Sequence, residues 1–172
     1  MRIRDVPSLR IRPIEPRDDA VIFDVIRAAR REFGVVGQGF DAEEPDRLDL
    51  SRVYNSVGAA YWVVELEDAI CGGGGVAPYA SVREDVCELQ RMYLAPMARG
   101  RGVGRLLLSA CLDTAQLFGY RQCYLETAAS LHQANRLYES AGFRRISEPP
   151  GHSHHPACDA FFMIDLPQPH GR

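Results

Sequence analysis

The stretch from Arg99 to Arg105, with the sequence RGRGVGR, carries three glycines at alternate positions. A strand-like run ends just before it at Pro96, and a helix-like run begins inside it at Val103. Where a strand enters a helix through glycines, several backbone N–H groups stay unpaired and the helix dipole adds partial positive charge. Such a turn binds anions, most often phosphate. The glycines also remove Cβ atoms that would keep a phosphate at a distance.

The spacing of these glycines separates the turn from other phosphate loops. It is not the GxGxxG fingerprint of dinucleotide sites, and it lacks the GK[ST] of nucleoside-triphosphate loops. All 20 basic residues of the chain are arginines, so a catalytic or phosphate-binding lysine is excluded. The turn is therefore predicted to hold a pyrophosphate, with Arg99, Arg101 and Arg105 adding full positive charges around it. The alternative is a glycine-rich turn whose arginines are solvated.

The composition bounds the class of protein. The 172 residues are 46% hydrophobic and 25% charged, which is typical of one globular domain. The net charge of −3 gives no indication of a nucleic-acid partner. The N-terminus has no apolar segment of a secretory signal, and no apolar run is long enough to span a membrane. The five cysteines are scattered without a CxxC pair, which favours buried free thiols in a reducing cytoplasm.

Strand and helix patterns alternate along the chain and must position the glycine turn. Apolar runs predict strands at residues 9–15, 60–67, 69–80, 85–96, 121–128 and 158–166. Apolar residues at helical spacing predict helices at residues 17–34, 43–56, 103–118 and 130–140. Asp18 or Asp19 is expected to cap the first helix, and Ser130 with Gln133 has the form of a capping box for the last. The interleaving predicts an α/β or α+β domain around a mixed sheet.

Four consecutive glycines, Gly72 to Gly75, fall inside the strand predicted at residues 69–80. Glycine is unusual inside a strand because it has no side chain to pack. The run is compatible with a flexible turn or a bulge. The alternative is the close approach of a ligand or a neighbouring backbone.

Two motifs together resemble a known family. The turn Arg99-x-x-Gly102-x-Gly104, after the run MYLAP, resembles the acetyl-CoA loop of the GCN5-related N-acetyltransferase (GNAT) superfamily. The segment from Ala134 to Phe143, ANRLYESAGF, resembles that family's second signature, a helix and turn. The order of elements between Val86 and Phe143 also matches. The chain further resembles small bacterial acetyltransferases that share runs such as AYWVVE, GGGG and CYLET.

The resemblance implies a single domain over residues 1–172, with a core at about residues 9–166. The implied GNAT fold has a central twisted sheet of six to seven strands, mixed but mostly antiparallel, flanked by about four helices. Acetyl-CoA is the implied co-substrate, and no metal is implied. A splay between the strand that precedes the loop and the strand CYLET would form a slot for the thioester, where a backbone N–H stabilises the oxyanion. The implied coenzyme contacts are Met92, Tyr93, Leu94, Arg99, Gly100, Arg101, Gly102, Val103, Gly104, Arg105, Asn135 and Tyr138.

Three residues are candidates for catalysis under this resemblance. Tyr138 matches the family's usual general acid, because a phenol is protonated at neutral pH and can donate to the leaving thiolate. The alternative is a core tyrosine on an apolar helix face. Glu88 and Glu126 each match a position used as base by some family members, and the alternative for each is a structural glutamate or a proton path through water. The sequence departs from the family at Leu131, where many members carry an asparagine.

The segment PPGHSHHPACDAFF holds three histidines, with Cys158 close by. The spacing matches no common zinc module, so metal binding is not predicted. In the family fold this segment lies near the acceptor slot, which makes His152, His154 and His155 candidate substrate contacts. The alternative is an ordinary surface loop.

The leading interpretation is an enzyme that transfers acetyl from acetyl-CoA to the primary amine of a small molecule, such as an amino acid, a polyamine or a drug-like amine. Acetylation of a protein N-terminus or lysine side chain is an alternative, as is a non-catalytic acyl-CoA-binding sensor. A homodimer is a further expectation, because members of this family often dimerise.

Overall fold

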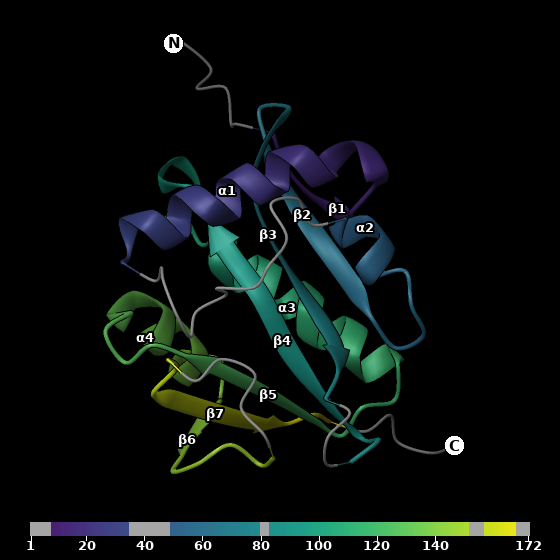
Figure 1. The fold of residues 1–172 in the computed structure, drawn as a ribbon, viewed down its shortest axis with the longest axis vertical. Coiled ribbons are helices and arrows are strands. Elements are labelled where there is room, and N and C mark those ends of the chain that lie inside the picture. The colour runs from purple at the N-terminus through teal and green to yellow at the C-terminus, as the bar shows by residue number, and fades with distance from the viewer. Residues whose placement is uncertain (1–7, 35–48, 80–82, 152–156, 168–172) are drawn as a thin grey trace, which may run out of the picture.

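The computed structural model describes residues 8–34, 49–79, 83–151 and 157–167, and its strands form a seven-stranded sheet in the spatial order β1-β2-β3-β4-β5-β7-β6 (Figure 1). The elements in chain order are β1 (Leu9–Pro13), η1 (Pro16–Asp18), α1 (Asp19–Glu32), α2 (Leu50–Val53), β2 (Ala60–Leu66), β3 (Ala69–Pro78), β4 (Val86–Leu94), η2 (Pro96–Ala98), α3 (Val103–Leu117), β5 (Gln122–Thr127), α4 (His132–Ser140), β6 (Arg144–Ile146) and β7 (Ala160–Asp165).

Neighbouring strands of this sheet are antiparallel except for β4 and β5, which are parallel. The predicted mixed, mostly antiparallel sheet is therefore confirmed. In Figure 1, α1 and α2 cross the front of the sheet and α3 runs behind it. The single parallel pair matters for function, because α3 connects its two strands and starts at the glycine loop.

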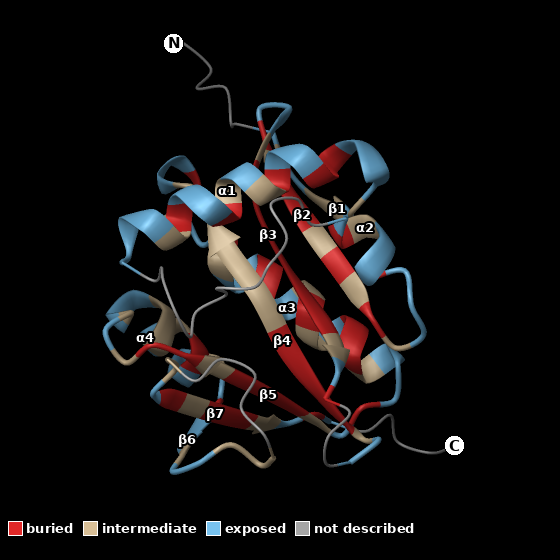
Figure 2. Cartoon of the chain, in the orientation of Figure 1, coloured by how far each residue is buried: buried red, intermediate tan, exposed pale blue. Residues whose placement is uncertain are grey.

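An apolar core lies on each face of the sheet (Figure 2). On one face, α3 buries Leu107 and Cys111 against the strands, and α4 packs on the same side through Tyr138. On the other face, α1 contributes Ile22 and α2 contributes Leu50. Each helix is held by its apolar stripe, so the sheet is a rigid support between two helical layers.

The glycine run forms the middle of β3 and is not a flexible turn. A Cβ on Gly72 would lie 2.6 Å from the carbonyl oxygen of Tyr93, and one on Gly75 would lie 2.7 Å from that of Ala60. A Cβ on Gly73 would meet Trp62 O at 2.7 Å. The close approach of neighbouring backbone is therefore confirmed, because β2 and β4 crowd β3 too tightly for side chains.

A β-bulge interrupts the pairing of this run with β4. Gly73 pairs with Tyr93 and Gly75 with Gln90, so two β4 residues, Arg91 and Met92, lie opposite Gly74. Arg91 has a positive φ of 49°, a conformation that a residue with a side chain rarely adopts. Bulges bend the strand that carries the extra residue. The bend in β4 falls where the strand leaves β5.

Several element boundaries differ from the predictions. The helix predicted from residue 17 opens with the 3-10 turn η1. Neither predicted cap bonds an amide of α1 with its side chain, because Asp18 binds Arg12 at 2.6 Å and Asp19 accepts from Ser51. The capping box predicted at Ser130 is wrong, because α4 has Leu131 as its N-cap and no side-chain cap bond. The three-residue strand β6 was missed since it is too short to show a period. Of the helix predicted at residues 43–56, the structure describes only residues from 49 onward, with α2 as their helix.

Candidate active site

The two parallel strands separate after a short paired stretch, which confirms the predicted splay. Pairing runs from Val86 with Gln122 to Glu88 with Tyr124 and then stops, although β4 continues to Leu94 and β5 to Thr127. A cavity of about 690 Å³ lies in the opening. Its walls come from the diverging ends of β4 and β5, the glycine loop, the first turns of α4, and Phe33 at the end of α1.

The glycine loop offers a row of unpaired donors to this cavity. Among the described residues, the backbone N–H groups from Gly100 to Gly104 meet no backbone acceptor, whereas those of Arg105 and Leu106 bind Gly102 O. Gly100 and Gly102 have φ of 70° and 78°, and a Cβ on either would meet no atom within 4 Å. Their conformation therefore requires glycine, and the space beside them is open. Unpaired amides beside open space at the start of a helix have the geometry of an anion-binding site.

Gly104 has a different role from the other two glycines. A Cβ at this position would lie 3.2 Å from the Leu137 side chain on α4. The glycine therefore lets α3 and α4 approach at the inner end of the loop. Val103 beside it is 2% exposed, so its side chain belongs to the core and only its backbone faces the loop.

The loop arginines do not share one role. The Arg99 guanidinium binds both carboxylate oxygens of Glu32, at 2.6 and 2.8 Å, and Arg99 lines the cavity. Arg105 lines the cavity and donates to Ser140 Oγ at 3.2 Å. Arg101 is exposed and is not among the lining residues. Arg99 and Arg105 are thus the loop arginines that line the cavity, the first paired with Glu32 on α1 and the second bonded to Ser140 on α4.

The end of β4 presents backbone groups to the cavity. Met92, Tyr93 and Leu94 all line it. The Ala95 N–H donates to Cys71 O on β3 at 2.7 Å, and since backbone groups alternate along a strand, those of Leu94 and Met92 point away from β3. They face the side that β5 has left. The Leu94 carbonyl oxygen accepts a hydrogen bond from Arg99 Nε at 2.8 Å, and the remaining groups form an edge that β5 does not pair.

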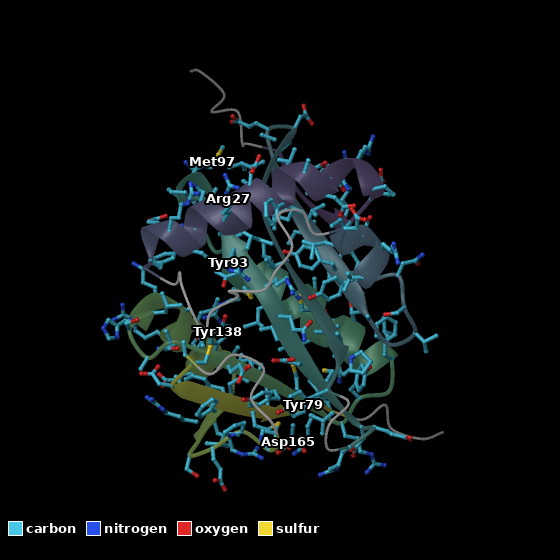
Figure 3. All side chains as sticks on the ribbon, in the orientation of Figure 1. Arg27, Tyr79, Tyr93, Met97, Tyr138 and Asp165 are labelled. Carbon is cyan, nitrogen blue, oxygen red and sulfur yellow. The ribbon has the colours of Figure 1, made fainter. Side chains whose placement is uncertain are left out.

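Tyr138 stands on α4 at the wall of the cavity and is 7% exposed. Its ring packs against Phe143 and Phe162, with centroids 5.9 and 6.1 Å away. Burial raises the pKa of its phenol well above the usual value, so the group keeps its proton at neutral pH. Figure 3 shows Tyr93 and Tyr138 at the wide end of the splay and Tyr79 near the paired end.

The two candidate carboxylates occupy different environments. Glu126 on β5 lines the cavity and accepts the Tyr124 hydroxyl at 3.1 Å. Glu88 is 3% exposed, does not line the cavity, and accepts Gln90 Nε2 at 2.6 Å. The structure therefore brings Glu126 to the cavity and leaves Glu88 buried within the paired part of the two strands.

The structure does not bring Asn135 to the cavity. Its Nδ2 donates to the carbonyl oxygens of Ala128 and Ala129, at 3.2 and 3.1 Å, which closes the turn between β5 and α4. Leu131, the departure from the family pattern, does line the cavity. The predicted substrate contacts His152, His154 and His155 lie outside the described residues.

Several lining residues were not singled out as site residues from the sequence, among them Phe33 and Arg91. Arg91 breaks the apolar pattern of β4 opposite the glycine run, and that combination signals a bulge. Phe33 follows the last turn of a helix and carries no pattern that points to a site. Within the described ranges, no group of three or more histidine, cysteine or acidic side chains could hold a metal ion, and no helix is both long and apolar enough to cross a bilayer.

Comparison with known proteins defines the class. The family model for the GNAT acetyltransferases matches residues 23–143, so the chain belongs to the GNAT acetyltransferase family. The uncharacterised N-acetyltransferase YjgM of Escherichia coli is 38% identical over 157 residues, which cover 91% of this chain and 94% of that protein. N-acetylaspartate synthetase of Danio rerio is 32% identical over 125 residues, or 69% of this chain and 44% of that protein.

Solved structures share the fold. A GNAT acetyltransferase from Staphylococcus aureus superposes with a TM-score of 0.80 over 93% of this chain and all of that chain, at 19% identity. YncA of Salmonella typhimurium, solved with acetyl-CoA, gives 0.77 over 95% of this chain and 97% of that chain, at 21% identity. The protein is therefore an acetyl-CoA-dependent acetyltransferase, and acetyl-CoA is its co-substrate.

Proposed function

We propose that the protein transfers the acetyl group of acetyl-CoA to the primary amine of a small molecule by direct attack in a ternary complex. The observation that carries the proposal is the splay of β4 and β5, whose cavity runs from the glycine loop to Tyr138 and Glu126. The glycine loop, the end of β4, Tyr138 and Glu126 thus all line the same cavity. Acetyl-CoA supplies the activated thioester. This chain binds and orients it, accepts the proton of the amine and protonates the departing thiolate.

Direct attack is favoured over an acyl-enzyme by the state of the thiols. Within the described residues, no cysteine lines the cavity. Cys111 is fully buried, and burial raises the pKa of its thiol; the pKa of the Cys123 thiol is also raised, first by its hydrogen bond with Cys87 and then by burial. A thiol that does not ionise is a poor nucleophile. The amine of the acceptor itself would therefore attack the thioester carbonyl.

Two side chains would handle the protons. The amine must lose a proton before or during attack, and Glu126 is the carboxylate that lines the cavity. Its hydrogen bond from the Tyr124 hydroxyl holds it in place. Tyr138 would protonate the departing thiolate, since its raised pKa keeps the phenol protonated. A backbone N–H at the free edge of β4 would stabilise the oxyanion as the amine attacks.

Within this class an amino acid is the acceptor that we favour. Proteins named N-acetylaspartate synthetase are 32% and 33% identical to the chain over their matched parts, although the chain spans less than half their length. The cavity carries Arg91 on β4 and Glu126 on β5, on the two strands that diverge. A guanidinium and a carboxylate across one space suit a zwitterion, with its carboxylate at the arginine and its amine at the glutamate.

The test is a titration of acetyl-CoA by calorimetry, followed by a screen of amines for release of free coenzyme thiol. Tight binding with turnover of an amino acid supports the full proposal. Turnover of peptides alone would assign the enzyme to protein acetylation, and binding without turnover of any amine or peptide would indicate a sensor. The proposal also includes a single domain that acts in the cytoplasm. The protein is further proposed to be a homodimer, and light scattering of the purified protein would check this oligomeric state.

A further inference from the structure

Arg99 begins the glycine loop, and its side chain joins three elements. Its Nη1 and Nη2 donate to the two carboxylate oxygens of Glu32 at the end of α1, at 2.6 and 2.8 Å. Its Nε donates to the Leu94 carbonyl oxygen at the end of β4, at 2.8 Å. Its guanidinium carbon lies 4.7 Å from the centre of the Phe33 ring. The N–H groups of the planar guanidinium are thus hydrogen-bonded, and its flat face packs on the Phe33 ring.

A neighbouring contact fastens the same turn of α1 to the same end of β4. Arg30 Nε donates to the Tyr93 hydroxyl at 3.3 Å, and the Arg30 guanidinium carbon lies 5.4 Å from the centre of the Tyr93 ring. Phe33, Tyr93 and Arg99 all line the cavity. The last turn of α1 is therefore a wall of the coenzyme cavity, held there by two arginines.

The charges argue against a direct role of Arg99 with phosphate. Its side chain is 22% exposed and forms a bidentate pair with a carboxylate, the strongest common form of ion pair. Glu32 is a negative charge next to a loop that must attract a dianion, so by itself it opposes coenzyme binding. Its presence is explained if it holds the arginine in position.

We propose that Arg99 is a positioning residue for acetyl-CoA: together with Glu32 it holds the end of α1, and Phe33 with it, against the glycine loop and the end of β4. The Arg99 side chain does not bind the pyrophosphate. The loop amides and Arg105 bind it, and the Arg99–Glu32 pair sets the width of the cavity in which the coenzyme lies. The inference concerns the coenzyme and does not depend on which acceptor the enzyme uses.

The sign of one substitution separates this role from a phosphate ligand. Glu32→Gln removes a negative charge, so if Arg99 bound phosphate directly, acetyl-CoA would bind as tightly as before or more tightly. The positioning role requires the opposite, a dissociation constant raised about three- to fivefold, the range for a partly exposed ion pair. Arg99→Lys keeps the charge and loses the fork, so it should weaken binding by a similar factor. The double variant should be no weaker than either single one, because both break one unit.

The measurement is calorimetric titration of acetyl-CoA and of free coenzyme A at several salt concentrations. Asp24→Asn is the matched control, since it removes one exposed negative charge from the same helix and should leave the dissociation constant unchanged. The salt dependence of binding should be the same for wild type and Arg99→Lys, and kcat at saturating acetyl-CoA should change less than twofold. Thermal melting of the free protein checks that each variant is folded at the titration temperature. Unchanged or tighter binding by Glu32→Gln overturns the inference, and a failure to bind acetyl-CoA by the wild type would instead contradict the glycine-loop assignment.

Discussion

Tyr138→Phe is the most informative substitution at the candidate site. The phenylalanine keeps the ring that packs on Phe143 and Phe162, so the core is unchanged. The Tyr138 hydroxyl has no side-chain hydrogen bond to the rest of the described chain, so its removal should change the free energy of unfolding by less than about 0.5 kcal/mol. Loss of a general acid should lower kcat by roughly one hundredfold, the lower end of the usual range. That factor corresponds to about 2.7 kcal/mol of transition-state stabilisation.

The assay follows release of the free coenzyme thiol with the best amine from the screen, beside calorimetric titration of acetyl-CoA. The dissociation constant should stay within about twofold, because the hydroxyl acts on the leaving group and not on the loop. Tyr120→Phe is the matched control. Its hydroxyl donates to Gly58 O at 2.8 Å, away from the cavity, so its loss should cost about 1 kcal/mol of stability and leave kcat unchanged. If Tyr138→Phe turns over at the wild-type rate, the acid assignment is wrong and Tyr138 is a core residue only.

Three further predictions test the loop, the carboxylate and the N-terminal ion pairs. Gly102→Ala places a side chain at φ 78° and should cost about 1–2 kcal/mol in the loop and weaken acetyl-CoA binding about tenfold. The control Gly119→Ala, at φ 87° and equally open but away from the cavity, should lower the melting temperature without affecting the affinity. Glu126→Gln should lower kcat/KM for the amine about one hundredfold with acetyl-CoA affinity unchanged, and equal activity at all pH values would remove its assignment as base. The hydrogen bond with Arg12 lowers the pKa of Asp18, so their pair stabilises the fold above the normal aspartate pKa, and this stabilisation is lost as the pH falls through the lowered pKa. Asp18→Asn should therefore reduce the dependence of the melting temperature on pH below the normal aspartate pKa of about 4, and an unchanged slope there would contradict the linkage.

The alternation of strands and helices was predictable because each element buries an apolar stripe or face whose period can be counted. The glycine turn was predictable for a similar reason, since a positive φ and unpaired helix amides need glycine at defined positions. The short strand β6 and the true start of α4 were not, because three residues show no period and a capping box forms only when the chain enters the helix at the right angle.

The sequence by itself determined the class of this protein: the loop from Gly100 to Gly104, the signature around Tyr138 and the mixed sheet all follow from local patterns. Only the tertiary structure decided what the charged side chains do. Arg99 and Arg105 have the same chemistry and lie six residues apart in the chain. Arg99 nevertheless pairs with Glu32, the last residue of α1, whereas Arg105 donates to Ser140 on α4. Glu88 and Glu126 are likewise both glutamates on predicted strands, and the point at which β4 and β5 stop pairing leaves Glu88 buried in the paired stretch and Glu126 at the cavity. The partner of a charge is set by contacts between segments far apart in the chain, which no local pattern contains.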